Sequence, residues 1–292
     1  MLPALMTAGA AALAAIGSAL VVPRRLRPDA TARVTALLAV TGASAFLWML
    51  VLVAGTALAE LHGVAERIMW CSDYIATHRD SLTPSGIFAL GGLAGVFVST
   101  AVVRRRQCAL RADPHAGELT IVVSEHADAF ALPGRPGEIV VTTGMLRALD
   151  PAERRVLLAH EHAHLRLGHH RYLRATELAV AVLPALHPML AKVRQATERW
   201  ADEEAARAVG DRALVARAIA RAALAAPASA KAQAFTGDDV VGRVQAMLTE
   251  PPVRSLAVVL RLGVVGAGLL ASTAASVVLV HHGVVALLGH CG

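Results

Sequence analysis

The amino-acid sequence predicts a mostly α-helical, polytopic membrane protein with four transmembrane helices and a cytoplasmic α+β domain that contains a small antiparallel sheet. Two observations lead to this fold class. Of the 292 residues, 55% are hydrophobic and 17% are charged, against about 25% charged residues in an average soluble chain. The apolar residues also concentrate in four stretches without Asp, Glu, Lys or Arg, and a long mixed sequence separates the third from the fourth.

Each of these stretches is long enough to cross a bilayer, which takes about 20 helical residues. They comprise Met1–Pro23, Val34–Ala59, Ser81–Val103 and the residues from Leu262 to the C-terminus. We predict three transmembrane helices within residues 1–103, at about 4–22, 34–58 and 84–103, with an outer loop at 60–80. Residues 258–292 hold the fourth helix and a short outer tail. Arginines follow the first stretch instead of preceding it, which indicates a retained anchor and not a cleaved signal peptide.

The charged residues beside the spans predict the orientation. Arginines cluster after the first and third spans, at Arg24, Arg25, Arg27 and at Arg104, Arg105, Arg106, whereas acidic residues dominate the 60–80 loop. Cytoplasmic segments carry the excess of basic residues. We therefore predict a multi-pass protein of the inner or plasma membrane, with both termini outside and a cytoplasmic domain at residues 104–257.

Composition also limits the partners and the redox chemistry. The net charge of +6 reflects arginines that flank spans and touch anionic lipid, and no aromatic platform accompanies them, so nucleic acid is not expected as a partner. Cys108 is predicted in the cytoplasm, which is a reducing compartment. Cys71 and Cys291 are both predicted outside, where a disulfide between them and two free thiols remain equal alternatives.

The cytoplasmic domain begins with strands and continues with helices. Strand-like segments occur at Leu119–Val123, Ala129–Leu132 and Glu138–Thr143, with a Pro/Gly turn before the last. Asp150, Pro151 and Glu153 form a helix start with N-cap, first-turn proline and capping box. That helix ends near Gly168, and further helices are predicted at about Arg171–Leu183, Met189–Ala208, Asp211–Ala225 and Asp239–Leu248.

The helix that begins at Asp150 carries the sequence His160-Glu161-His162-Ala163-His164. A spacing of four places His160 and His164 on one helix face, where both imidazoles reach one metal ion. Glu161 lies beside the first of them, in position to take a proton from a metal-bound water. His162 faces away from the pair and is not expected to be a ligand. The pattern predicts one catalytic Zn²⁺ per chain.

A catalytic zinc takes three protein ligands, so a third donor is required. Glu198 and Asp202 have the same spacing of four on a later helix, which allows Glu198 to bind the metal while Asp202 supports a ligating imidazole. The alternative is a solvated acidic face, since Glu203 and Glu204 are adjacent. The upstream histidine pair favours the ligand interpretation.

The chain resembles the membrane-anchored zinc metallopeptidases that act as antirepressors in β-lactam resistance signalling, which are related to the CAAX prenyl proteases and the heat-shock membrane proteases. The resemblance covers about residues 119–210: Phe130–Gly134, Ile139–Gly144, His160–His164, His187-Pro188 and Glu198–Asp202. It implies a zincin-like metallopeptidase domain in which His160, His164 and Glu198 bind zinc, Glu161 is the general base and Asp202 supports a ligand.

The chain departs from these resistance regulators in the motif that senses the antibiotic. The resistance sensors carry an outer penicillin-binding domain with a Ser-x-x-Lys motif, and neither Lys192 nor Lys231 has a serine three positions before it. Direct β-lactam sensing is therefore not expected, and the trigger is expected from the outer loop, a membrane sensor partner or the bilayer.

The function expected from the sequence is a membrane-anchored zinc endopeptidase that cleaves a cytoplasmic protein, such as a transcriptional repressor, in signalling or quality control. His126 and Arg243 are candidates for oxyanion or substrate contacts, with His169 and His170 as further ones. The strand ending at Leu132 or the one at Glu138–Thr143 is a candidate to pair with substrate. Two alternatives stay open: an intramembrane metalloprotease, and a catalytically silent metal-binding scaffold or sensor.

Overall fold

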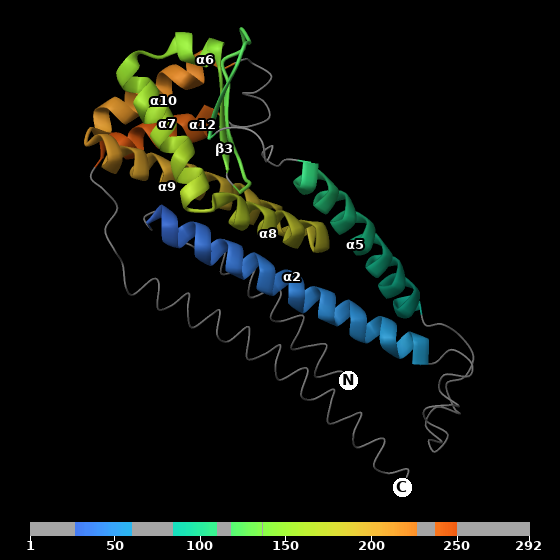
Figure 1. Ribbon diagram of the computed structural model, residues 1–292. Helices are drawn as coiled ribbons and strands as arrows, with labels where there is room; N and C mark the ends of the chain where they lie inside the picture. The colour runs from blue at the N-terminus through green and yellow to red at the C-terminus, as the bar shows by residue number, and fades with distance from the viewer. Residues whose placement is uncertain (1–26, 60–83, 110–117, 136, 227–236, 250–292) are drawn as a thin grey trace, which may run out of the picture.

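The computed structural model describes residues 27–59, 84–109, 118–135, 137–226 and 237–249. The predicted spans at 4–22 and 258–292, the 60–80 loop, Cys71 and Cys291 lie outside these residues. The described part is mostly helical, with one small sheet at an edge of a helical layer (Figure 1).

Two long apolar helices precede the sheet in the chain. Helix α2 (Pro28–Ala59) and helix α5 (Pro84–Ala109) are, within the described residues, the two helices long and apolar enough to cross a membrane. Both exceed the predicted spans: α2 begins six residues before Val34, and α5 continues through the arginines to Ala109. This supports membrane association.

The sheet is mixed, so the predicted antiparallel sheet is wrong in part. Its order is β1 (Leu119–Val122), β3 (Glu138–Thr142), β2 (Ala129–Leu132), with β1 parallel and β2 antiparallel to β3. The reason is burial: every residue of β3 is buried, so β3 takes the centre, while the largely exposed β1 lies at an edge. Because β3 is paired on both sides, it has no edge to offer a substrate, which corrects that candidate.

A short helix that the sequence analysis did not predict, α6 (Thr143–Ala148), follows β3 directly. The Thr142 hydroxyl accepts a hydrogen bond from Met145 N and caps α6. Gly144 lies against the chain at Glu125, where a Cβ would collide with backbone atoms. Glycine is therefore required by close approach, and this contact fixes the end of the sheet against the loop before β2.

The remaining helices are α7 (Pro151–Arg166), α8 (His169–Val182), α9 (His187–Val209), α10 (Arg212–Ala225) and α12 (Gly237–Leu248), with a 3-10 turn η1 (Pro184–Leu186) before α9. The predicted helices agree with these to within a few residues. The predicted capping box is present: Asp150 Oδ1 accepts from Ala152 N and Glu153 N, and Glu153 Oε2 accepts from Asp150 N. Gly210, with φ of +73°, ends α9.

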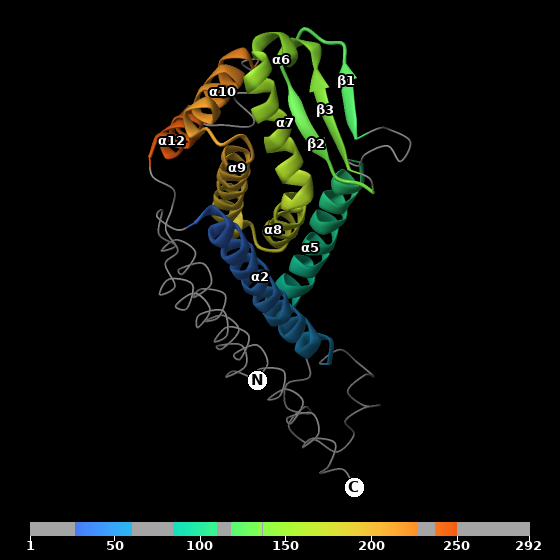
Figure 2. The same ribbon diagram turned by 60° about the vertical axis from the view of Figure 1, so that its left-hand side comes forward.

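Helix α2 packs against α8 and α9 as well as against α5 (Figures 1 and 2). One apolar cluster joins α2 to the α8–α9 turn; it contains Leu38, Ala39 and Ala43 of α2 with Ala179, Leu186 and Met189. Helix α2 is thus packed in one core with α8 and with α9, the helix that carries Glu198. Burial of such apolar surface stabilises at about 25 cal/mol per Å².

Candidate metal centre

Helices α7 and α9 position the three residues of the candidate site. They pack side by side along their lengths, and α7 is anchored at its start by the Asp150 capping box. Arg154, one turn further on, donates from Nε to Leu146 O and Leu149 O. These bonds fix the rotation of α7, so His160 and His164 face α9.

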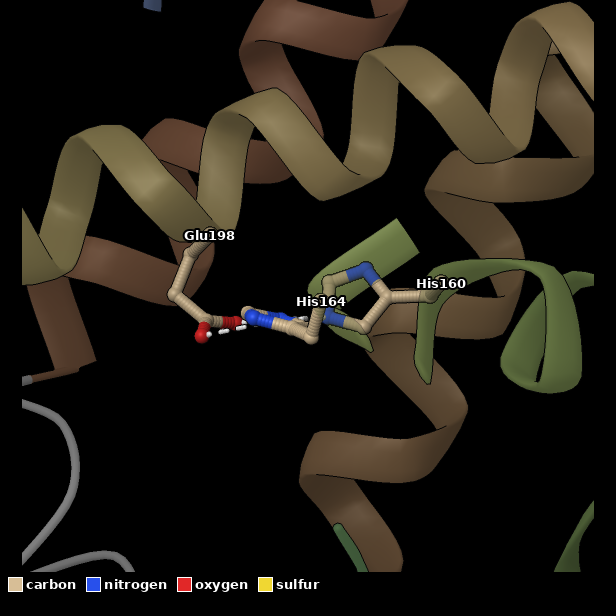
Figure 3. A group of neighbouring side chains, drawn as sticks. All are labelled: His160, His164 and Glu198. Carbon is tan, nitrogen blue, oxygen red and sulfur yellow. Dashed lines mark hydrogen bonds and ion pairs between the residues drawn. The ribbon is translucent and has the colours of Figure 1, made fainter. Parts of the chain in front are cut away.

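The two imidazoles and one carboxylate converge between the helices (Figure 3). His160 Nε2 and His164 Nε2 are 3.1 Å apart. Each is 3.4 Å from one oxygen of Glu198, His160 from Oε2 and His164 from Oε1. The solvated-face alternative for Glu198 does not describe this arrangement, since its side chain is 23% exposed and directed at the histidines.

The two 3.4 Å separations fit a zinc ion, and the 3.1 Å separation of the two nitrogens is slightly shorter. Bonds of about 2.0–2.2 Å to nitrogen and oxygen at tetrahedral angles separate neighbouring donor atoms by about 3.3–3.5 Å. The donor set of two imidazoles and a carboxylate is also one that catalytic zinc uses, with a further position for water. His160, His164 and Glu198 are therefore suited to hold the ion, as the sequence analysis expected.

Asp202 lies one turn after Glu198 and is 1% exposed. Its Oδ1 is 3.0 Å from His160 Nδ1. Since an ionised carboxylate only accepts, His160 donates from Nδ1 and keeps the Nε2 lone pair for the ion. The structure thus brings Asp202 to His160, and its supporting role stays a prediction.

Arg243, on α12, is buried against both carboxylates. It donates to Asp202 from Nε at 2.8 Å and from Nη2 at 2.7 Å, and its Nη1 is 3.0 Å from Glu198 Oε2. The sequence analysis named Arg243 as an oxyanion or substrate contact. In the structure these bonds direct its guanidinium at the carboxylates of α9, where it holds Glu198 and Asp202 in place.

The charged groups set one another's pKa values. Burial acts to raise the pKa of Glu198, but the charges of Arg243, His164 and His160 together outweigh burial and hold it below its ordinary value. Burial also acts to raise the pKa of Asp202, and the charge and hydrogen bonds of Arg243 and His160 together lower it. Burial acts to lower the pKa of His160, yet its bonds to Asp202 and Glu198 raise it to about 10. In the metal-free site both carboxylates are thus ionised and His160 is protonated, so a metal ion must displace a proton.

Glu161 lines a cavity of about 710 Å³ together with His160 and Glu198. Burial raises the pKa of Glu161 to about 7, the range in which a general base works best near neutral pH. The rest of the cavity wall is mainly apolar and comes from four helices and the start of β2; it includes Ala129, Leu149, Leu157, Ile219, Ala222 and Val244.

None of the other predicted histidines lines this cavity. His126 is exposed and His162 lines a hollow on the opposite side of α7, next to Ala208. His169 is fully buried, with Nδ1 at 3.0 Å from His164 Nδ1. Sequence reasoning treated His169 only as an oxyanion candidate and missed this contact, although its position five residues after His164 was a usable signal.

Comparison with known families gives one match. Residues 100–186 match the model of Peptidase family M48. The matched range contains the sheet and α7 with both histidines, and it ends before Glu198. No match was found among curated proteins or among solved structures. The match supports a metallopeptidase of the M48 family, whose members are metal-dependent and typically use zinc.

Proposed function

We propose that this chain, with its M48 match, is a membrane-anchored zinc-dependent endopeptidase that cleaves a cytoplasmic protein. The observation that carries the proposal is the convergence of His160, His164 and Glu198 within 4.8 Å of one another, beside a carboxylate, Glu161, that lines an apolar cavity. A purely structural metal site has no need of a base at its edge.

The residues divide the chemistry between them. His160, His164 and Glu198 hold the ion, while Asp202 and Arg243 fix the orientation of His160 and Glu198. When bound, zinc supplies a Lewis acid that polarises the peptide carbonyl and acidifies water. Glu161 accepts a proton from the attacking water and later delivers it to the leaving amine.

The cavity supports a substrate with a large apolar residue next to the scissile bond. Its volume of about 710 Å³ exceeds that of any single side chain, and burial of an apolar side chain there contributes about 1.5–3 kcal/mol to binding. Among the described residues β2 pairs only with β3, and its first residue, Ala129, lines the cavity. An extended substrate that adds to the outer edge of β2 therefore runs past the site.

Anchoring in the membrane is supported by α2 and α5. Only 11% of the apolar window of α5 is buried within the structure, whereas the core helix of a soluble protein is mostly covered. Three consecutive arginines, Arg104–Arg106, lie near its C-terminal end, which by the positive-inside rule assigns that end, and the site beyond it, to the cytoplasm. We propose a transcriptional repressor as one such substrate and a membrane protein as the sensor partner.

Two variants of the full chain test the peptidase mechanism. Glu161→Gln removes the base and keeps the size of the side chain, so we expect zinc at one ion per chain but cleavage slowed by at least about 100-fold. The matched control is His162→Gln, because His162 is the next residue and lies on the side of α7 away from the candidate ligands. This variant should retain both zinc binding and cleavage. A peptide library and cytoplasmic extracts serve as substrates, with cuts expected beside large apolar residues.

Equal cleavage by the Glu161→Gln variant and the wild type would overturn the mechanism. Bound zinc without cleavage by the wild type would instead favour the silent scaffold. Loss of zinc in His160→Ala and Glu198→Ala, but not in His162→Gln, tests the ligands. Cleavage only within transmembrane segments would favour the intramembrane alternative, which the short, charged helix α7 does not support.

A further inference from the structure

His164 and His169 face each other through their Nδ1 atoms, which are 3.0 Å apart. Gly168 makes the contact possible: its left-handed conformation, with φ of +64°, turns the chain between α7 and α8. His169, the first residue of α8, is thereby folded back onto α7. The two rings meet edge to face, at 89° with centroids 4.8 Å apart.

A hydrogen bond between two imidazoles needs one donor and one acceptor, and a neutral imidazole carries one N–H. His164 Nε2 is directed at His160 Nε2 and at Glu198, so binding an ion through it requires a lone pair there. The proton of His164 must then reside on Nδ1, and His169 Nδ1 must accept it. The opposite arrangement puts a proton on His164 Nε2, where it blocks the ligand position.

Burial keeps the His169 imidazole neutral. Its side chain is fully buried, and its Nε2, which carries the ring proton in this assignment, has no hydrogen-bond partner among the described residues. A fully buried imidazole without a carboxylate partner stays neutral, so a lone pair is available. Trp200 lies against the ring, with centroids 4.9 Å apart, and Arg33 of α2 lies 4.9 Å from the Trp200 ring. The packing of Trp200, which itself contacts Arg33 of α2, therefore holds the His169 ring in place.

We propose that His169 is a positioning residue that accepts the Nδ1–H of His164 and thereby keeps the His164 Nε2 lone pair directed at the metal. The inference rests on the proposed zinc function. It makes the two imidazole ligands unequal: His160 is supported by a carboxylate, and His164 by a neutral ring. Such supporting residues typically contribute 10–100-fold to metal affinity.

Two substitutions at position 169 separate hydrogen bonding from packing. His169→Phe keeps the size and the contact with Trp200 but has no acceptor. His169→Asn is smaller, but its Oδ1 is separated from the backbone by the same number of bonds as the Nδ1 of histidine, so it can still accept a hydrogen bond. We expect the Phe variant to bind Zn²⁺ about 10–100-fold more weakly, and the Asn variant to stay within about 5-fold of wild type. Zn²⁺ affinity is measured on the full-length chain in detergent by chelator competition, without an activity assay.

The reverse order, with Phe near wild type and Asn impaired, would overturn the inference and make His169 a packing residue. Equal affinity in all three proteins would overturn it too. A measurement on the unmodified chain complements the variants: ¹⁵N chemical shifts of zinc-loaded wild type should show His169 protonated on Nε2 and bare on Nδ1, and the opposite tautomer contradicts the proposal. Failure of the wild type to bind Zn²⁺ would instead refute the proposed function.

Discussion

Replacing Arg243 by methionine removes a cation that two carboxylates share and keeps a side chain of similar length. The guanidinium makes three contacts of 2.7 to 3.0 Å with Asp202 and Glu198. Asp202 is 1% exposed and Arg243 is 8% exposed, so this ion pair is buried. The variant leaves an uncompensated carboxylate in the protein interior.

Removal of one partner from a buried ion pair destabilises a protein by about 3–5 kcal/mol, because the other charge stays buried without compensation. For a domain of about 150–250 residues, each kcal/mol shifts the midpoint of unfolding by about 2–4 °C, which gives a loss of about 6–20 °C for metal-free Arg243→Met. Zinc adds positive charge next to Glu198, so the loss should be smaller in the zinc-loaded protein.

The midpoint is followed by tryptophan fluorescence of the full chain in detergent, with and without zinc. The matched control is Arg194→Met, which breaks an exposed pair with Glu177, 3.3 Å apart at 55% and 30% exposure; exposed pairs contribute about 0–1 kcal/mol. A loss in Arg243→Met no larger than in the control would refute the reasoning. An equal loss with and without zinc would show that Arg243 does not compensate the ligand carboxylate.

Two further predictions concern stability. Burial raises the pKa of Glu161 from 4.5 to about 7, so the metal-free folded state binds the Glu161 proton more tightly than the unfolded state does. The protonated Glu161 therefore contributes to stability below pH 4.5, and this contribution is lost as the pH rises to 7. Glu161→Gln should therefore raise the midpoint of unfolding of the metal-free protein at pH 8 relative to wild type by more than it does at pH 4.5; an equal effect at both pH values would contradict this. Gly144→Ala should destabilise by at least about 1–3 kcal/mol, because its Cβ meets the Glu125 backbone, whereas Gly242→Ala, in open space on α12, should stabilise by up to about 1 kcal/mol. Denaturant titration of the two glycine variants measures their free energies of unfolding. Similar changes in both variants would show that the loop at Glu125 moves to accommodate the added Cβ.

Local sequence patterns predicted the helices well because their determinants lie within one turn. The Asp150 capping box and the spacing of His160 and His164 need no distant partner, and both are present. The three strands were located as well. Their pairing was not, because register and neighbours depend on which strand is buried, and β3 takes the centre through contacts on both faces.

The sequence by itself thus determined the composition of the candidate site: two histidines and Glu161 on α7, and two carboxylates one turn apart on α9. It also determined two apolar helices of membrane-spanning length. The tertiary structure decided what those residues touch. Arg243 reaches Asp202 across 41 positions, and α2 packs on α8 and α9. His169 turns back onto His164 at Gly168. Such contacts arise when distant segments bury their apolar faces together, and no periodicity within a single segment encodes them.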